Sequence, residues 1–201
     1  MKLIKGLLLG LSVLLASTVF AENSPVPMLQ ETADHILTTL KQNKANLKNN
    51  PQVIYQAVQK YLLPNVDVAG MSRSVLGRQA WLKATPSERV EFSRAFTQLV
   101  IRTYASPLAE YTDETIKFLP VRGSSNERFV RVNSMIIRSN GNNIPLAYSL
   151  VAKEGKWKIY DLSVEGVSLL QSFRSQFAQA LQGANMQDLI KQMNERSKQA
   201  A

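Results

Sequence analysis

The apolar pattern at the start of the chain differs from the pattern that follows it. Lys2 and Lys5 precede a largely apolar run over 7–20, and the sequence Val-Phe-Ala at 19–21 places small residues three and one positions before a cut after Ala21. This three-part layout is typical of a cleavable secretory signal. A membrane-spanning helix needs about 20 apolar residues, and this run is shorter and ends in a cleavage-type sequence. We therefore expect 1–21 to be removed and 22–201 to form a single domain.

Apolar residues at helical spacing dominate the first half of that domain. Asn50 and Pro51 are a typical end of one helix and start of the next, and Pro64 closes the second. Thr85 and Glu88 form a capping box that opens a long helix. The predicted helices are 30–47, 51–63, a short one between Asp67 and Gly77, and 86–111.

The period then changes from helical spacing to alternation, which is typical of strands. We predict four strands, at 115–121, 129–138, 144–152 and 157–164. Asn140-Gly141 and Glu154-Gly155-Lys156 have the composition of tight hairpin turns. A second capping box at Ser168 and Gln171 opens a helix that ends at Gly183, a last helix starts at Met186, and the tail 195–201 is expected to fray. The order of elements favours an α+β fold, with a four-stranded antiparallel sheet covered on one face by helices.

Charge and cysteine content narrow the classes of function. The net charge of +9 becomes +7 once Lys2 and Lys5 are removed, which favours anionic partners or simply a soluble surface. Nucleic acid is not expected as a partner outside the cytoplasm. The chain has no cysteine, which excludes disulfides and thiolate metal sites and leaves no lipidation cysteine after the apolar run.

Candidate catalytic chemistry is sparse. The only histidine, His35, lies on an amphipathic helix and is interpreted as a boundary residue, because a catalytic base needs partners. Asp161 and Glu165 are four residues apart at a strand end, so their carboxylates would point to the same side and could hydrolyse a sugar bond. The alternative is structural: Asp161 would tie the strand end to neighbouring backbone, and Glu165 would shape a turn.

Large apolar side chains are spread over helices and strands alike. The long helix and the meander could enclose an apolar cavity between them, or the same residues could form an ordinary filled core, which close packing favours. Periodicity alone does not separate these two interpretations.

The C-terminal part of the chain resembles a known family. The run WKIYDLSVEGVSLL at 157–170, followed by SFRSQF at 172–177, is similar to the signature of the MlaC family, the toluene-tolerance family of periplasmic phospholipid-binding proteins. The similarity extends in order over nearly the whole domain. The other matching pieces are Pro64-Asn65-Val66-Asp67, Leu76-Gly77, Trp81, Glu91-Phe92, Phe96, Tyr104 and Tyr148-Ser149-Leu150.

This resemblance implies a function and a setting. The family is a soluble shuttle between two membranes that helps to maintain outer-membrane lipid asymmetry. Its partners are an outer-membrane lipoprotein–porin complex and the substrate-binding ring of an inner-membrane ABC transporter. It implies a twisted antiparallel sheet with helices enclosing an apolar lipid pocket, no catalysis, no metal, no cofactor, a diacyl phospholipid as cargo, and no stable membrane insertion.

The resemblance also favours the cavity over the filled core. From it and from the apolar pattern we predict the residues that line the pocket. They are Leu76, Phe96, Val100, Tyr104, Val132, Ile136, Tyr148, Leu150, Val167, Leu170 and Phe173.

Basic residues could frame the mouth of this pocket or meet acidic partner surfaces. Those considered are Arg73, Arg78, Arg89, Arg94, Arg102 and Arg174. Two other functions remain as alternatives: an exported enzyme that uses Asp161 and Glu165, and a packed scaffold that binds only protein.

Overall fold

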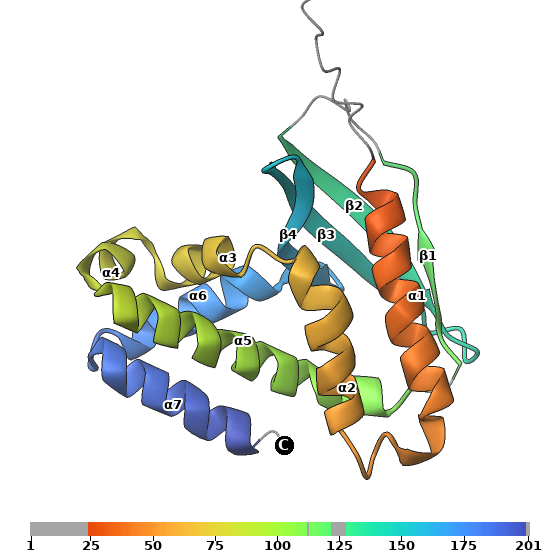
Figure 1. Ribbon diagram of the computed structural model, residues 1–201, viewed down its shortest axis with the longest axis horizontal. Helices are drawn as coiled ribbons and strands as arrows, with labels where there is room; N and C mark the ends of the chain where they lie inside the picture. The colour runs from red at the N-terminus through yellow and green to blue at the C-terminus, as the bar shows by residue number, and fades with distance from the viewer. Residues whose placement is uncertain (1–23, 112, 122–127, 200–201) are drawn as a thin grey trace, which may run out of the picture.

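The computed structural model describes residues 24–111, 113–121 and 128–199, so the expected signal sequence lies outside the described residues. Figure 1 shows an antiparallel sheet with α1 and α2 beside it, and a group of helices, α3 to α7, that extends away from the sheet. We call α3 to α7 the helical layer. The helices are α1 (Val26–Gln42), α2 (Gln52–Ala57), α3 (Val68–Leu76), α4 (Arg78–Lys83), α5 (Pro86–Ala109), α6 (Leu169–Ala180) and α7 (Met186–Gln199).

The sheet is a meander in which each strand pairs with the next one along the chain, in the order β1-β2-β3-β4-β5. The strands are β1 (Thr115–Phe118), β2 (Phe129–Ile137), β3 (Ile144–Lys153), β4 (Lys156–Val164) and β5 (Val167–Ser168). The predicted α+β class is confirmed, but the predicted number of strands is corrected from four to five. Glu165 and Gly166 adopt φ of 51° and 83°, which turns the chain back so that Val167 pairs with Val164.

Local sequence signals account for several helix boundaries. Thr85 and Glu88 form the predicted capping box at the start of α5. Asp67 caps α3 by accepting a hydrogen bond from the Gly70 backbone N–H, and α3 ends at Gly77, whose φ is 81°. Ser168 caps α6 by accepting from the Gln171 backbone N–H.

Other boundaries differ from the prediction because tertiary packing overrides local sequence. The tail does not fray at 195: α7 continues to Gln199, since Met193 and Ser197 are buried. The short helix α4 was not predicted. The predicted helix 51–63 is divided into α2, a π-helical turn at Val58–Leu62 and a 3₁₀ turn at Leu63–Asn65.

Buried apolar side chains form three clusters. The helical core joins α3, α5, α6 and α7 around Phe92, Phe96, Phe173 and Phe177. The second cluster packs α1, α2 and α5 together, and the third, which we call the sheet core, packs α1 against the sheet. Leu62 contacts both the second and the third cluster, so the π-helical turn connects them. Among the described residues no helix has both the length and the apolar character needed to cross a membrane.

Candidate functional site

One face of the sheet is almost entirely apolar. Alternate residues of a strand point to the same face, and paired residues of adjacent strands share that face. The register therefore aligns rows of side chains across the sheet on the face that α1 covers. From one end of the sheet to the other these rows are Val130–Leu150–Ile159, then Val132–Tyr148–Leu162, then Phe118–Ser134–Leu146–Val164–Val167, and last Ile116–Ile136–Ile144.

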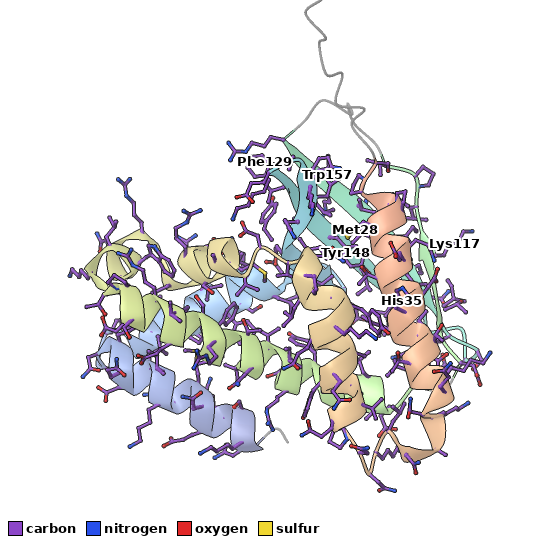
Figure 2. The ribbon with its side chains drawn as sticks, viewed as in Figure 1. Met28, His35, Lys117, Phe129, Tyr148 and Trp157 are labelled. Carbon is purple, nitrogen blue, oxygen red and sulfur yellow. The ribbon has the colours of Figure 1, made fainter. Side chains whose placement is uncertain are left out.

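The first of these rows is closely packed. Leu150 and Ile159 are 0% and 4% exposed, and with Val132 and Leu29 of α1 they form the sheet core. Trp157, labelled in Figure 2 at the upper end of the sheet, packs against the same cluster. This end of the face is a filled interior, as the close packing of protein cores requires.

The opposite end of the same face is different. We define the sheet-foot patch as the six aliphatic residues of the last two rows: Ile116, Ile136, Ile144, Leu146, Val164 and Val167. None of the six belongs to, or packs against, the three clusters of the described residues. Five of them are only partly buried, and Val167, at the β5 edge, is 59% exposed. The patch is therefore an apolar surface with contact area still available.

The eleven predicted lining residues divide among these regions. Leu76, Phe96, Leu170 and Phe173 are buried in the helical core, while Val100 and Tyr104 lie at its edge, partly buried. Val132 and Leu150 are in the sheet core, with Tyr148 packed against it. Only Ile136 and Val167 belong to the sheet-foot patch. The structure thus places the predicted set in three neighbouring regions instead of around one surface.

Four patch residues were not among those predicted, namely Ile116, Ile144, Leu146 and Val164. Alternation identifies each of them as facing one side of a strand. The register between neighbouring strands brings the four residues together, and the sequence of a single strand does not reveal that register. Leu170 links the patch region to the helical layer, because its backbone N–H donates to Asp161 of β4 at 3.0 Å.

Tyr148 brings a polar atom to this apolar face, and Tyr104 lies at the edge of the helical core. Tyr148 lies in the middle of the sheet, with its ring centroid 5.8 Å from that of Phe118. Burial raises the pKa of the Tyr148 phenol. Burial also raises the pKa of Tyr104 on α5. Both phenols therefore stay protonated at neutral pH and can donate a hydrogen bond.

Comparison with known proteins identifies the family. The model of the MlaC protein family matches residues 30–195 of this chain. The chain belongs to the MlaC family. It is 34% identical to the toluene tolerance protein ttg2D of Pseudomonas putida over 90% of this chain and 85% of that protein. It is 28% identical to the intermembrane phospholipid transport system binding protein MlaC of Haemophilus influenzae, over 92% of this chain and 88% of that protein.

A solved structure extends the family match to three dimensions. The phospholipid-binding protein from Ralstonia solanacearum, determined in complex with a phospholipid, superposes with a TM-score of 0.81 at 27% identity. The match covers 89% of this chain and 99% of that chain. The fold of this MlaC-family chain is therefore that of a protein whose structure contains a phospholipid.

In this MlaC-family chain, the surroundings of the two carboxylates considered for catalysis favour structural roles for both. Asp161 accepts hydrogen bonds from the backbone N–H groups of Leu162 and Leu170 and from the Ser168 hydroxyl, at 2.9, 3.0 and 2.6 Å. Glu165 is exposed and lies in the tight turn, not on the strand. The expectation that the pair shares one side of a strand is wrong, and the structural role predicted for Asp161 is confirmed.

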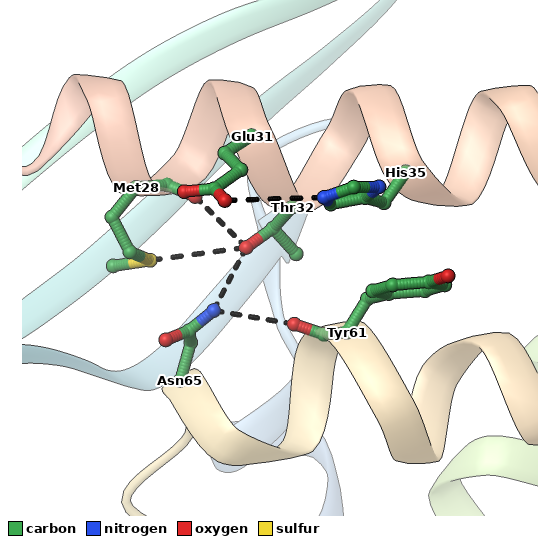
Figure 3. Close-up of polar contacts among 6 residues, drawn as sticks. All are labelled: Met28, Glu31, Thr32, His35, Tyr61 and Asn65. Atoms are coloured by element: carbon green, nitrogen blue, oxygen red, sulfur yellow. Dashed lines mark hydrogen bonds and ion pairs between the residues drawn. The ribbon is translucent and has the colours of Figure 1, made fainter.

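His35 lies at the contact between α1 and the π-helical turn (Figure 3). Its ring stacks on that of Tyr61 with the centroids 4.5 Å apart, and its Nε2 is 3.9 Å from a carboxylate oxygen of Glu31. Beside it, Asn65 donates hydrogen bonds to the Thr32 hydroxyl at 2.9 Å and to the Tyr61 carbonyl at 3.2 Å. These contacts hold α1 against the following helix, so His35 is a boundary residue of a helix contact, as predicted.

Among the residues that the structure describes, no group of three or more His, Cys, Asp or Glu side chains could hold a metal ion.

The arginines considered for the pocket mouth lie in different places. Arg89 lies over the Trp81 ring and donates to the Trp81 carbonyl, and Arg102 lies over the Tyr55 ring. Arg78 and Arg174 instead lie together at a groove in the helical layer, where α4 and α6 contribute to its lining.

Proposed function

We propose that this MlaC-family chain binds a phospholipid, with acyl chains against the sheet-foot patch, and carries it between two membranes. The observation that carries the proposal is the patch itself: six aliphatic side chains on one face, in register, that the three buried clusters leave uncovered. The lipid-bound neighbour of the same fold and the phospholipid-transport relative support lipid as the occupant.

We infer the lining of the site from the residues around the patch. Val100 and Tyr104 at the edge of the helical core would form the opposite wall, together with Leu170, which is buried in that core and bonded through its backbone to β4. Ile136, Tyr148 and Val167 contribute from the sheet. The remaining predicted residues, Leu76, Phe96, Val132, Leu150 and Phe173, would support the walls from within the two cores.

The free energy of moving the acyl chains into water determines how fast the lipid is released. Each methylene removed from water contributes about 0.8 kcal/mol, so two acyl chains bound in an apolar site would escape into water slowly. Release would then need a partner that opens the site. Rapid loss of lipid to vesicles in the absence of any partner would contradict this step.

The proposal also covers where the protein works and which complexes it exchanges lipid with. The apolar run 7–20 would direct export to the periplasm, where acyl chains need a carrier, and 22–201 would be the single phospholipid-binding domain. The carrier would exchange lipid with an outer-membrane lipoprotein–porin complex and with the substrate-binding ring of an inner-membrane ABC transporter. This exchange would help to maintain outer-membrane lipid asymmetry.

The test uses two neighbouring isoleucines with opposite orientation. Ile136 pairs with Ile116 and Ile144 and belongs to the patch, whereas Ile137 pairs with Thr115 and faces the other side of the sheet. Both are partly buried. Native mass spectrometry of freshly purified protein, with lipid extraction, should find about one diacyl phospholipid per chain in the wild type and in Ile137→Glu. It should find little or none in Ile136→Glu, because a carboxylate against acyl chains is costly.

The alternatives give different outcomes. A packed scaffold would contain no lipid in any of the three proteins. An enzyme that depends on Asp161 and Glu165 would lose turnover in the double amide variant, while lipid content stayed the same. Equal lipid content in Ile136→Glu and Ile137→Glu would overturn the placement of the acyl chains on this face.

A further inference from the structure

A groove lies in the helical layer, away from the sheet, where α4 forms one end of the molecule (Figure 1). Its volume is about 520 Å³, and its walls come from α3, α4, α6 and the starts of α5 and α7. Four of its lining residues are small: Gly77, Ala80, Ala84 and Ala178. A Cβ at Gly77 would meet no atom within 4 Å, so the space beside the α3–α4 turn is open.

The rim of the groove is basic. Arg78, Lys83 and Arg174 line it, and none of the three forms an ion pair with a carboxylate in the part of the chain that the structure describes. The one lining carboxylate, Glu88, accepts hydrogen bonds from the Thr85 backbone N–H at 2.8 Å and from the Thr85 hydroxyl at 2.9 Å. Glu88 keeps its negative charge, but three cations line the groove against this one carboxylate, so the net charge that a ligand meets is positive.

Apolar contact area accompanies this charge. Leu181 and Met186 line the groove, and both are partly buried. Leu82 is 63% exposed, and it lies four residues after Arg78 on α4, hence on the same helix face. The surface therefore combines a hollow, a positive rim and a large apolar side chain beside it.

We propose that this groove docks an acidic segment of a partner protein. One apolar side chain of the segment fills the hollow, and flanking carboxylates meet Arg78, Lys83 and Arg174. A protein fits better than a membrane, because a rigid hollow is complementary to a projecting side chain, whereas membrane surfaces are bound by apolar side chains that project from the protein. The inference goes beyond lipid binding and does not depend on it.

The position of the groove determines how docking relates to lipid exchange. It lies in the helical layer near α4 (Figure 1), and none of its lining residues belongs to the sheet-foot patch, which strands β1 to β5 form. A partner held at the groove would leave the patch uncovered. Docking and lipid exchange could then involve separate surfaces of one chain.

The experiment uses a fluorescein-labelled amphipathic peptide of Glu, Leu and Ala, titrated with purified, lipid-loaded protein and followed by anisotropy. Two companion peptides replace every Leu with Ala or every Glu with Lys. The charge variant is Arg78→Glu with Arg174→Glu, and the cavity variant is Ala178→Trp, which fills the hollow without changing charge. The matched control is Lys117→Glu with Arg131→Glu, two exposed cations on the sheet face opposite the patch.

The proposal expects the Kd for the acidic Leu peptide to rise at least tenfold in the charge variant and in the cavity variant, and less than twofold in the control. Both companion peptides should bind more weakly than the acidic Leu peptide, and lipid content should be the same in all variants. Equal loss in the charge variant and the control, no effect of Ala178→Trp, or no peptide binding to the wild type would overturn it. Groove-dependent binding to phosphatidylglycerol vesicles with no binding of the peptide would instead assign the groove to a membrane and would also overturn it.

Discussion

The helical core and the sheet-foot patch are both built from apolar side chains but differ in how these side chains are buried. In the helical core Phe92, Phe96 and Phe177 are at most 3% exposed, and their rings meet in edge-to-face contacts 5.6 and 5.9 Å apart. In the patch, aliphatic side chains of five strands share a face and remain partly exposed.

This difference separates stability from function. Edge-to-face aromatic contacts in a closed core add to the free energy gained from burial, so the helical core stabilises the domain without any ligand. A partly exposed aliphatic surface contributes less to stability, because folding has removed only part of its area from water. That remaining area is what a bound acyl chain can use. Four predictions test this separation.

The largest effect is expected in the helical core. Phe92 is 0% exposed, and Phe92→Ala should lower the free energy of unfolding by about 4 kcal/mol, because it removes apolar burial and leaves a cavity. Urea unfolding followed by circular dichroism measures this. The control Phe129→Ala, at a ring that is 53% exposed, should cost less than about 1 kcal/mol. The fraction of Phe92→Ala that folds should still contain lipid; folded protein without lipid would show that the two regions are not separate.

The second prediction compares two leucines on one strand. Leu150 and Leu146 lie on the same face of β3, but Leu150 is 0% exposed in the sheet core, whereas Leu146 is partly buried in the patch. Leu150→Ala should cost about 3 kcal/mol, and Leu146→Ala about 1 kcal/mol in lipid-free protein. In lipid-loaded protein the cost of Leu146→Ala should increase, because the variant contacts the acyl chains less and so gains less stability from bound lipid than the wild type does. Equal costs at both positions in lipid-free protein would mean that the patch is as closely packed as the core.

The third prediction concerns the connection between the two regions. Asp161 on β4 accepts three hydrogen bonds, two of them from Ser168 and Leu170 at the start of α6. Asp161→Ala leaves these donors without a partner and should lower the free energy of unfolding by about 2 kcal/mol. The matched change Glu165→Gln, in the exposed turn, should be nearly neutral. A neutral Asp161→Ala would show that the start of α6 is held by packing alone.

Much of the fold could be predicted because its signals are local. The capping box at Thr85 and Glu88, the turns at Gly141 and Gly155, and the alternation in the strands each depend on a few neighbouring residues. The errors have nonlocal causes. The strand β5 exists because Val167 pairs with Val164, and α7 persists to Gln199 because Met193 and Ser197 are buried against other helices.

The candidate site was harder to predict for the same reason. An apolar residue in a core and one in a binding surface have the same chemistry, so Phe96 and Ile136 could not be told apart from their sequence patterns. Their exposure and the register of their neighbours distinguish them. Leu146 and Val164 belong to the patch through pairing between strands, and the resemblance to the family does not identify that pairing.

The smallest expected effect concerns an ion pair between α3 and the sheet. The Asp67 carboxylate caps α3, and Lys153 of β3 donates to it at 3.0 Å. Burial by itself would raise the pKa of Asp67, but the hydrogen bonds from Lys153 and the Gly70 N–H, with the charges of Lys153 and Arg73, lower it below the usual 3.8. A carboxyl whose pKa is lower in the folded state than in the unfolded state stabilises the fold above the unfolded pKa. That contribution is lost as the pH falls through the folded pKa.

Asp67→Asn tests this contribution, because asparagine still caps a helix but has no charge. Above about pH 5 the variant should be less stable than the wild type by about 0.5 kcal/mol, a small value because Lys153 is largely in solvent. The difference should decrease as the pH falls below about 4, as followed by urea unfolding of both proteins between pH 3 and 6. A difference that grows on acidification would mean that the charge of Asp67 destabilises the fold. The contact between the helical layer and the sheet would then depend on the Asp161 hydrogen bonds and on packing, not on this ion pair.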